Sequence, residues 1–289
     1  MTQASSPAEK KLFLLDAYAL IFRAYFAFAK NPRITSGGLD TSAVYGFTSA
    51  LLDLLSKENP SHIAVCFDLP EPTERHSIFP EYKANRKKRR ETDSTDWTSL
   101  FEFLHQMIAD LREYFPYKVM RVERAEADDI IAVLTQEEMK NPTTIISSDK
   151  DFIQLQKYEG VQQWSPLTKS FVKGNPEESL WEKLIKGDVG DGVPNILSSD
   201  DTLVTEGKRQ RPVSKKKMEL WKTDRSDWNE DMKRNFNRNE MMVDLEKTPE
   251  SIRINIINQF REQVPPHGRL MEYFTEKRLK NLMEHLDEF

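Results

Sequence analysis

Three short apolar runs, each followed by an aspartate, constrain the fold of this chain more than any other feature. Runs of this kind, partly β-branched, are typical of strands buried in a parallel sheet. Ligand sites in open α/β sheets lie just beyond the carboxyl ends of the strands. Three separate segments are therefore expected to deliver acids to one edge of one sheet. The runs occupy residues 12–15, 63–67 and 144–148, and the acids that follow them are Asp16, Asp68 and Asp149.

Six more carboxylates lie in other motifs: one beside Asp149, three at the start of a predicted helix and two in a glycine-rich segment. Massed carboxylates repel one another unless cations neutralise them, and hard oxygen ligands of this kind suit Mg²⁺ or Mn²⁺. Because alternate residues of an extended segment face the same side, Asp149 and Asp151 can reach one metal pair. We therefore predict a magnesium site, in which Mn²⁺ can substitute, formed by all nine acids. The six are Glu126, Asp128, Asp129, Asp151, Asp188 and Asp191.

Three of the motifs, two acidic and one basic, also have a simpler interpretation that involves no active site. The acids of residues 126–129 can cap a helix N-terminus, where the helix dipole favours negative charge. The glycine-rich segment 187–195 can be a solvated turn. The segment 82–86, a tyrosine beside cations, is the usual mix for binding a nucleic-acid strand, but it can also be a solvated charged loop or a localisation-like signal.

Charge and cysteine content narrow the class of partner. The total charge of the 289 residues is −5, so setting the nine acids aside leaves +4. Clustered Lys and Arg form the electrostatic footprint of a phosphate-backbone ligand. The single cysteine, Cys66, excludes a disulfide framework and a Cys/His zinc site, and fits a reducing compartment. The two basic clusters are Lys83, Arg86, Lys87, Lys88, Arg89 and Arg90, and Lys208, Arg209, Arg211, Lys215, Lys216 and Lys217.

The order of patterns predicts an α/β fold with a parallel central sheet flanked by helices. Strands are also expected at 117–122 and 143–148, and helices at 41–57, at 97–115 and from about 126. The expected divisions are a disordered tail at 1–10, a core at 11–187 and a helical DNA-binding subdomain at 188–289. The segment 69–95, proline-bearing and then basic, is expected to form an arch-like insertion in the core.

Residues 11–29 resemble a secretory signal peptide, because a basic start is followed by an apolar stretch and by a sequence like a cleavage site. Asp16 and Arg23 interrupt the apolar part, which disfavours a signal, so we predict a strand followed by a helix. The chain lacks a run of 18 apolar residues and is expected not to span a membrane. We expect a cytoplasmic monomer.

Taken together and in order, the motifs resemble the 5′-nuclease family, which includes flap endonucleases and the 5′-nuclease domain of bacterial DNA polymerase I. From about residue 164 onward, including 265–269 and 287–289, the chain is more similar to T-even-type phage ribonuclease H. No polymerase domain follows, so we expect a free-standing nuclease. The matching motifs are FLLDAY at 13–18, Asp68, YKANR at 82–86, EADD at 126–129, SSDKDF at 147–152 and GDxxD at 187–191.

The resemblance implies a two-metal 5′→3′ exonuclease and flap endonuclease with ribonuclease H activity. Its substrates are 5′ ends or flaps of DNA and RNA–DNA duplexes, and its role is primer removal in replication. Lys83 and Arg86 contact the scissile phosphate, Tyr82 stacks on a base, and Arg23 lies near the substrate. The acids at 16, 68, 126, 128 and 149 surround the first ion, and those at 151, 188 and 191 hold the second. Asp129 matches an acid present in only some members.

One segment departs from the family pattern. Many members have a glycine-rich helix–three-turn–helix that grips duplex phosphates, but residues 195–201 lack those glycines. Duplex binding is therefore expected to rest on the cluster from Lys208 to Lys217, while Lys87 to Arg90 contact the substrate from the arch. The C-terminal residues 279–289 have helical apolar spacing and are expected to pack on the core. Docking to a single-strand DNA-binding protein or a sliding clamp stays open for them.

Two other functions stay open on the sequence alone. A toprim-like or phosphatase-type Mg²⁺ enzyme also uses strand-end acids, but does not need the motifs at 82–86 and 187–191. A catalytically silent DNA-structure-binding protein should have lost some acids, and none of the expected ones is missing.

Overall fold

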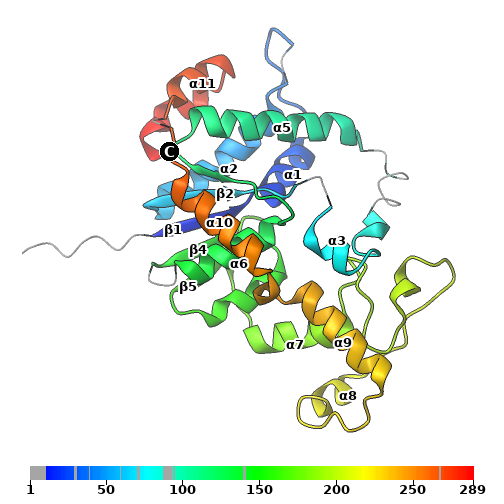
Figure 1. Cartoon of the computed structure of the whole chain (residues 1–289). Helices are drawn as coiled ribbons and strands as arrows, with labels where there is room; N and C mark the ends of the chain where they lie inside the picture. Colours follow the sequence, from blue (N-terminus) through cyan, green and yellow to red (C-terminus); the bar gives the residue numbers. More distant parts are fainter. Residues whose placement is uncertain are drawn as a thin grey trace, which may run out of the picture.

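A single six-stranded sheet, in the order β3-β2-β1-β4-β5-β6, forms the centre of the molecule (Figure 1). The computed structural model describes residues 11–28, 31–38, 40–58, 60–69, 72–86, 93, 95–138, 141–266 and 268–289. Neighbouring strands are parallel except for the antiparallel pair β5 and β6. The α/β fold with a mainly parallel sheet is therefore confirmed. The strands are β1 (Leu12–Asp16), β2 (His62–Cys66), β3 (Lys118–Met120), β4 (Thr143–Ile146), β5 (Val161–Ser165) and β6 (Ser170–Val172).

The β5–β6 hairpin has no counterpart among the predicted strands. β5 carries Gln162 and Gln163 in its centre, so it lacks the apolar run that marks the others. Gln163 is nevertheless fully buried, because its side-chain amide donates to the carbonyls of Ser147 and Asp149. A buried amide satisfied by backbone acceptors lets a polar strand lie inside the sheet.

Alternation along the central strands builds two cores, one on each face of the sheet. Phe13 and Leu15 of β1 pack against α1 (Ala17–Phe28), α2 (Ser42–Glu58) and α5 (Trp97–Tyr114). Leu12 and Leu14 face α6 (Ala127–Glu137), η1 (Lys150–Lys157) and α10 (Glu250–Glu262) on the other side. The helices expected at 41–57, at 97–115 and from about 126 are thus confirmed as α2, α5 and α6. Cys66 is buried in the second core.

A smaller lobe of helices lies beyond the end of β6, at the lower right of Figure 1. α7 (Pro176–Lys186), α8 (Lys215–Leu220) and α9 (Glu230–Val243) pack around Trp181, Trp221 and Trp228. A long loop with the 3-10 helix η2 (Asp200–Leu203) joins α7 to α8. In that loop the Asn195 side chain accepts from the Leu197 N–H and donates to the carbonyl of Arg211. Side-chain bonds therefore hold a segment in which glycines were expected.

The chain after this lobe returns to the sheet and packs on both cores, and the predicted division at residue 187 stays a prediction. The short 3-10 helix η3 (Leu245–Lys247) leads into α10, and Ile252 and Ile256 join the second core. Next, α11 (Leu270–Glu276) and η4 (Lys280–Glu288) close over α5 and α2 in the first core. Sequence periodicity could not reveal this return, because an amphipathic helix does not specify which surface it covers.

The C-terminal stretch packs inward, as its helical spacing predicted. Leu279 and Leu282 are buried, and Phe289 contacts the rings of Phe115 and Phe274. The Tyr117 hydroxyl also donates to the carbonyl of Phe289. Met283, Leu286 and Phe289 are partly buried, so the alternative in which this stretch docks a replication partner stays a prediction. Among the helices that the structure describes, none combines the length and apolar character needed to cross a bilayer.

Candidate active site

Eight of the nine predicted carboxylates line one cleft of about 920 Å³ at the carboxyl edge of the sheet. β1 lies between β2 and β4, so the segments that follow these three strands emerge side by side. The helix α6 and the turn after α7 add acids from two further directions. Asp129 does not line the cleft. The eight are Asp16, Asp68, Glu126, Asp128, Asp149, Asp151, Asp188 and Asp191.

Local hydrogen bonds fix the strand-end carboxylates. One oxygen of Asp16 accepts from the Ala19 N–H at 3.2 Å, and the other accepts from the Ser147 hydroxyl at 2.8 Å. Asp68 accepts from the N–H of Ala127, in the first turn of α6, at 2.6 Å. Asp149 accepts from the Asp151 N–H at 2.9 Å. The acids are therefore oriented by the backbone of their own and neighbouring segments, which limits their ability to move apart.

The electrostatics of these acids favour a cation among them. Burial, together with repulsion from Asp68 and Asp149, raises the pKa of Asp16 to about 6. Burial and the same kind of repulsion raise the pKa of Asp128 well above its usual value. Burial also raises the pKa of Asp68, although Lys83 offsets part of the rise. Ionising these buried, mutually repelling carboxylates costs free energy. A cation bound among them stabilises their ionised form.

The donor set fits a hard divalent cation. In the described ranges, no lysine or arginine forms an ion pair with Asp16, Asp68, Asp128 or Asp149. All four offer only oxygen ligands, which Mg²⁺ and Mn²⁺ prefer. No three acidic, imidazole or thiol side chains of the described residues already converge as the ligands of a bound ion do. Because an ion offsets repulsion between like charges, an ion is expected to draw these oxygens together.

A lysine that the sequence analysis missed lies among the remaining acids. Lys183, in the last turn of α7, contacts Asp151, and its Nζ lies 2.6 Å from Oδ2 of Asp188. Burial and repulsion from Asp149 raise the pKa of Asp151 to about 7, although Lys183 acts against the rise. The net effect of Lys183 and local hydrogen bonds is to lower the pKa of Asp188, despite its burial. The spacing of five residues between Lys183 and Asp188 carries no known signal for such a contact.

Lys83 and Arg86, for which contact with the scissile phosphate stays a prediction, line the same cleft. The Nζ of Lys83 lies 2.8 Å from Oε1 of Glu126, and Arg86 contacts Asp191. Lys83 has a left-handed φ of 56°, and its N–H donates to the carbonyl of Asp191. A side chain on Gly192 would begin 3.0 Å from the carbonyl of Glu81, so glycine permits this close approach. The acidic turn and the basic segment are therefore joined through their backbones.

The stacking role predicted for Tyr82 is not compatible with its position. Its side chain is 3% exposed and packs with Phe79, Val193 and Met242. The hydroxyl donates to Glu126 at 2.9 Å and approaches Asp191 at 3.1 Å. A ring enclosed on both faces cannot receive a nucleobase, so Tyr82 instead orients two carboxylates of the cleft.

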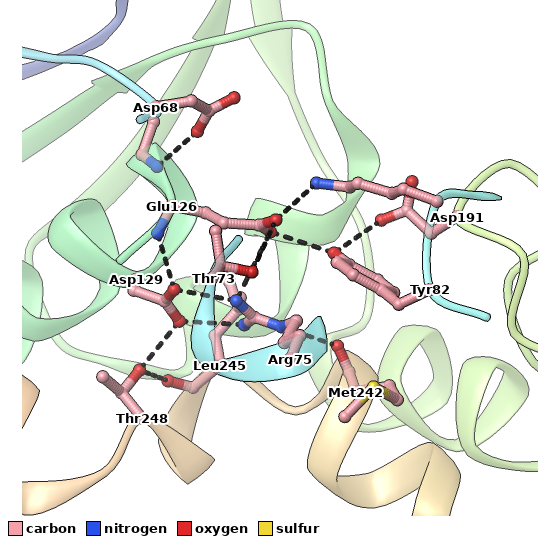
Figure 2. Close-up of polar contacts among 12 residues, drawn as sticks. Asp68, Thr73, Arg75, Tyr82, Glu126, Asp129, Asp191, Met242, Leu245 and Thr248 are labelled. Atoms are coloured by element: carbon pink, nitrogen blue, oxygen red, sulfur yellow. Dashed lines mark hydrogen bonds and ion pairs between the residues drawn. The ribbon is translucent and has the colours of Figure 1, made fainter. Parts of the chain in front are cut away.

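Asp129 is committed to a buried ion pair rather than to the cleft (Figure 2). Its two oxygens accept from Nη1 and Nη2 of Arg75 at 2.7 and 2.9 Å. It also accepts from the Glu126 N–H, which completes a capping box, and from the Thr248 hydroxyl. The prediction that Asp129 binds metal is therefore replaced by a structural role. The alternative in which the acids of 126–129 cap a helix therefore applies to Asp129, which takes part in the capping box of α6.

Arg75 connects three parts of the molecule through that pair. It lies on α3 (Glu74–Ile78), contacts Asp129 and Glu126 on α6, and donates through Nε to the carbonyl of Met242 on α9 (Figure 2). Neither partner helix is close to Arg75 in sequence, so no local pattern identified it. Through its contact with Glu126, Arg75 also holds that carboxylate in position at the cleft.

Replacing Arg75 with methionine is expected to destabilise the protein by about 3–5 kcal/mol, because it leaves Asp129 buried without its cation. Arg124→Met is the matched control, since it removes a more exposed pair with Glu74 and is expected to cost about 0–1 kcal/mol. Urea unfolding of both variants measures the difference. Equal midpoints would show that the buried pair contributes no more than a surface pair.

The other predicted substrate residues lie away from the carboxylates. Arg23 lines a separate cavity of about 230 Å³ with Tyr45, Trp164 and Lys169. Lys208 pairs with Asp201. Arg209, Lys215, Lys216 and Lys217 are exposed on the lobe around α8. Lys87, Lys88, Arg89 and Arg90 lie outside the described residues, so their predicted contacts stay predictions.

Metal and protons are expected to compete for the cleft. An acid whose pKa is raised on folding makes the folded state less stable as pH rises from its unfolded value to its folded value. For Asp16 that interval runs from 3.8 to about 6. At pH 7.5, above the pKa of Asp16, Mg²⁺ should raise the Tm, by an amount equivalent to about 2.7 kcal/mol at a hundred times Kd. At pH 5.5 the gain should shrink.

Scanning calorimetry with Mg²⁺ or EDTA at the two pH values measures this difference, with NaCl added to match ionic strength. An equal Mg²⁺-induced rise in Tm at both pH values would contradict competition between the ion and the protons.

Comparisons with known proteins identify the family of the chain. The family described as "5′-3′ exonuclease, N-terminal resolvase-like domain" matches residues 11–184, and "T4 RNase H, C terminal" matches residues 174–289. Ribonuclease H of Enterobacteria phage T4 is 36% identical over 220 residues, which is 72% of each chain. DNA polymerase I of Treponema pallidum is 34% identical over 201 residues, covering 65% of this chain and 19% of the polymerase.

Solved structures share the fold at lower sequence identity. A bacteriophage T5 flap endonuclease in complex with DNA and metal ions has a TM-score of 0.63 and 18% identity, covering 94% of this chain and 98% of that one. The T5 5′-exonuclease with bound zinc has a TM-score of 0.59 and 19% identity, covering 94% and 99%. With its two matched regions covering residues 11–289 and with a relative above 30% identity, the chain belongs to the 5′-3′ exonuclease family of nucleases and carries a C-terminal part of the T4 ribonuclease H type.

Proposed function

We propose that this protein is a divalent-metal-dependent 5′ nuclease that hydrolyses phosphodiester bonds at 5′ ends and flaps of DNA and RNA–DNA duplexes. The observation that carries the proposal is the convergence of eight carboxylates on one cleft that is rimmed by Lys83 and Arg86. The relatives support it, because they include a ribonuclease H and a flap endonuclease. Removal of RNA primers during replication is the role that the likeness to ribonuclease H and polymerase I suggests.

The residues divide into two proposed metal-holding groups. Asp16, Asp68, Asp128 and Asp149, with Glu126, hold the first ion, and Asp151, Asp188 and Asp191 hold the second. When bound, two ions activate water and stabilise the entering and leaving oxygens of an in-line displacement. No side-chain nucleophile is needed, and Lys83 and Arg86 place positive charge where the phosphate enters.

Base stacking is reassigned to the opposite wall of the cleft. With Tyr82 buried, the aromatic side chains that line the cleft belong to α1 and α5, namely Tyr18, Phe22 and Phe101. Tyr18 and Phe22 stack on each other with centroids 5.6 Å apart, and none of the three is fully buried. Stacking on aromatic rings is tolerant of base identity, so this wall suits unpaired nucleotides next to the scissile phosphate.

Duplex binding is proposed for the lobe around α8. Lys215, Lys216 and Lys217 occupy the first turn of α8, where the helix dipole disfavours positive charge. Three lysines at this end of a helix are unfavourable for its stability, and binding of an anionic partner by their ammonium groups explains them. Phosphates of the duplex supply that charge, in keeping with the departure from the glycine-rich pattern of many members.

A pair of labelled substrates tests the proposal. The full chain is incubated with a 5′-labelled flap and with an RNA-primed duplex, each in Mg²⁺ or EDTA. We expect short 5′ products from both substrates with Mg²⁺ and none with EDTA. Binding to both substrates without cleavage under every metal condition would instead indicate a silent structure-binding protein.

A further inference from the structure

A protein cation already occupies one of the two proposed metal-holding groups. The Nζ of Lys183 lies 2.6 Å from Oδ2 of Asp188 and also contacts Asp151. The two carboxylates come from different elements, one at the start of η1 and the other in the turn after α7. Each of the three side chains is about one-fifth exposed, so the contact lies in the cleft rather than on the open surface.

The two groups of acids therefore differ in charge balance. In the second group, Asp151 and Asp188 share the single positive charge of Lys183, and Arg86 pairs with Asp191. In the first group, the described residues supply no ion pair to Asp16, Asp68, Asp128 or Asp149. A divalent ion meets four carboxylates without an ion pair beside the Lys83-paired Glu126 in the first group. In the second group it meets three carboxylates that share two cations. The attraction for the ion is correspondingly unequal.

We propose that the ammonium group of Lys183 is a built-in competitor of the second divalent ion for Asp151 and Asp188. This inference rests on the proposed two-ion function. An ammonium group and a metal ion on the same two carboxylates repel each other and share the negative charge, so each weakens the binding of the other. The protein then loads its ions in order, first at the four-acid group and then, at higher concentration, at the group held by Lys183.

A count of bound Mn²⁺ tests the competition without relying on activity. The full chain, free of nucleic acid, is titrated with Mn²⁺, and free Mn²⁺ is followed by electron paramagnetic resonance. Lys183→Met keeps most of the apolar stem and removes the charge, and Lys183→Arg keeps the charge. Lys186→Met is the matched control, because Lys186 lies on the same helix and pairs with Glu182 on the surface.

We expect the parent to bind two Mn²⁺ ions with unequal affinities. Lys183→Met should tighten the weaker site by at least about tenfold, because one unit of positive charge leaves its ligands. Lys183→Arg and Lys186→Met should leave that site weak. Circular dichroism spectra matching that of the parent establish that the variants are folded.

Two results would overturn the inference, and they separate it from the function. If the parent binds two ions and Lys183→Met leaves the weaker site unchanged or weaker, the competition is absent while the two-ion function stands. If neither protein binds a second ion at any concentration, the two-ion proposal and the competition fall together.

Discussion

Asp149→Asn is expected to abolish metal-dependent cleavage while the protein stays folded. Asp149 lies at the floor of the cleft, and its charge raises the pKa of Asp16, Asp128 and Asp151. The substitution removes a ligand charge from the site, and the rate should fall by more than the roughly 10- to 100-fold typical of an outer-shell partner. The amide oxygen of asparagine can still accept from the Asp151 N–H, so local geometry is retained.

Although Asp149→Asn should lose cleavage, its thermal stability and its affinity for DNA without metal should not fall. Since repulsion among the remaining acids decreases, the Tm in EDTA should be unchanged or higher, and DNA binding without metal should be unchanged or tighter. Single-turnover cleavage of a 5′-labelled flap, with anisotropy in EDTA, measures both quantities. The control is Asp53→Asn, which removes an exposed acid paired with Lys169. Strong cleavage by Asp149→Asn with an unaltered Mg²⁺ titration would mean that the metal-holding group is wrongly assigned.

Lys83→Ala is expected to lower the single-turnover rate by about 10²-fold, as removal of a pre-placed charge at a transition state typically does. The ammonium group is held in the cleft by Glu126 at 2.8 Å and is 17% exposed. Although burial alone would raise the pKa of Glu126, Lys83 and Arg75 lower it to about 2, so Glu126 stays ionised in their presence. The substitution therefore removes a positive charge that we propose faces the phosphate, and it loosens Glu126, which we propose holds metal. Kd should change little.

A variant of the basic residues on α8 should affect binding rather than the rate of cleavage, in contrast to Lys83→Ala. Replacing Lys215, Lys216 and Lys217 with alanine should weaken binding to every duplex and reduce the slope of log K against log salt. The expected reduction is roughly 0.7 to 0.9 for each phosphate that the protein no longer neutralises. The rate at saturating enzyme should barely change. A normal rate for Lys83→Ala, or an unchanged salt slope for the triple variant, would contradict this division between chemistry and binding.

Local pattern determined the parts of this protein that depend on neighbours in sequence. Apolar runs predicted four of the strands in the sheet, because a strand buried on both faces must be apolar throughout. The positions of Asp16, Asp68 and Asp149 at strand ends followed from those runs, since parallel strands end at one edge. The helical spacing at 279–289 likewise predicted inward packing, which Phe289 and its ring contacts confirm.

Tertiary structure alone decided what each polar side chain contacts. The partner of Asp129 is Arg75, 54 residues away, and nothing in either local sequence distinguishes that pair from a surface acid and a surface base. Tyr82 is buried because Val193 and Met242, far along the chain, close over it. Lys183 reaches Asp151 because α7 folds back beside η1. Periodicity reports which face of an element is apolar, whereas charge pairing depends on where distant elements meet, so the sequence located the acids and the fold determined their roles.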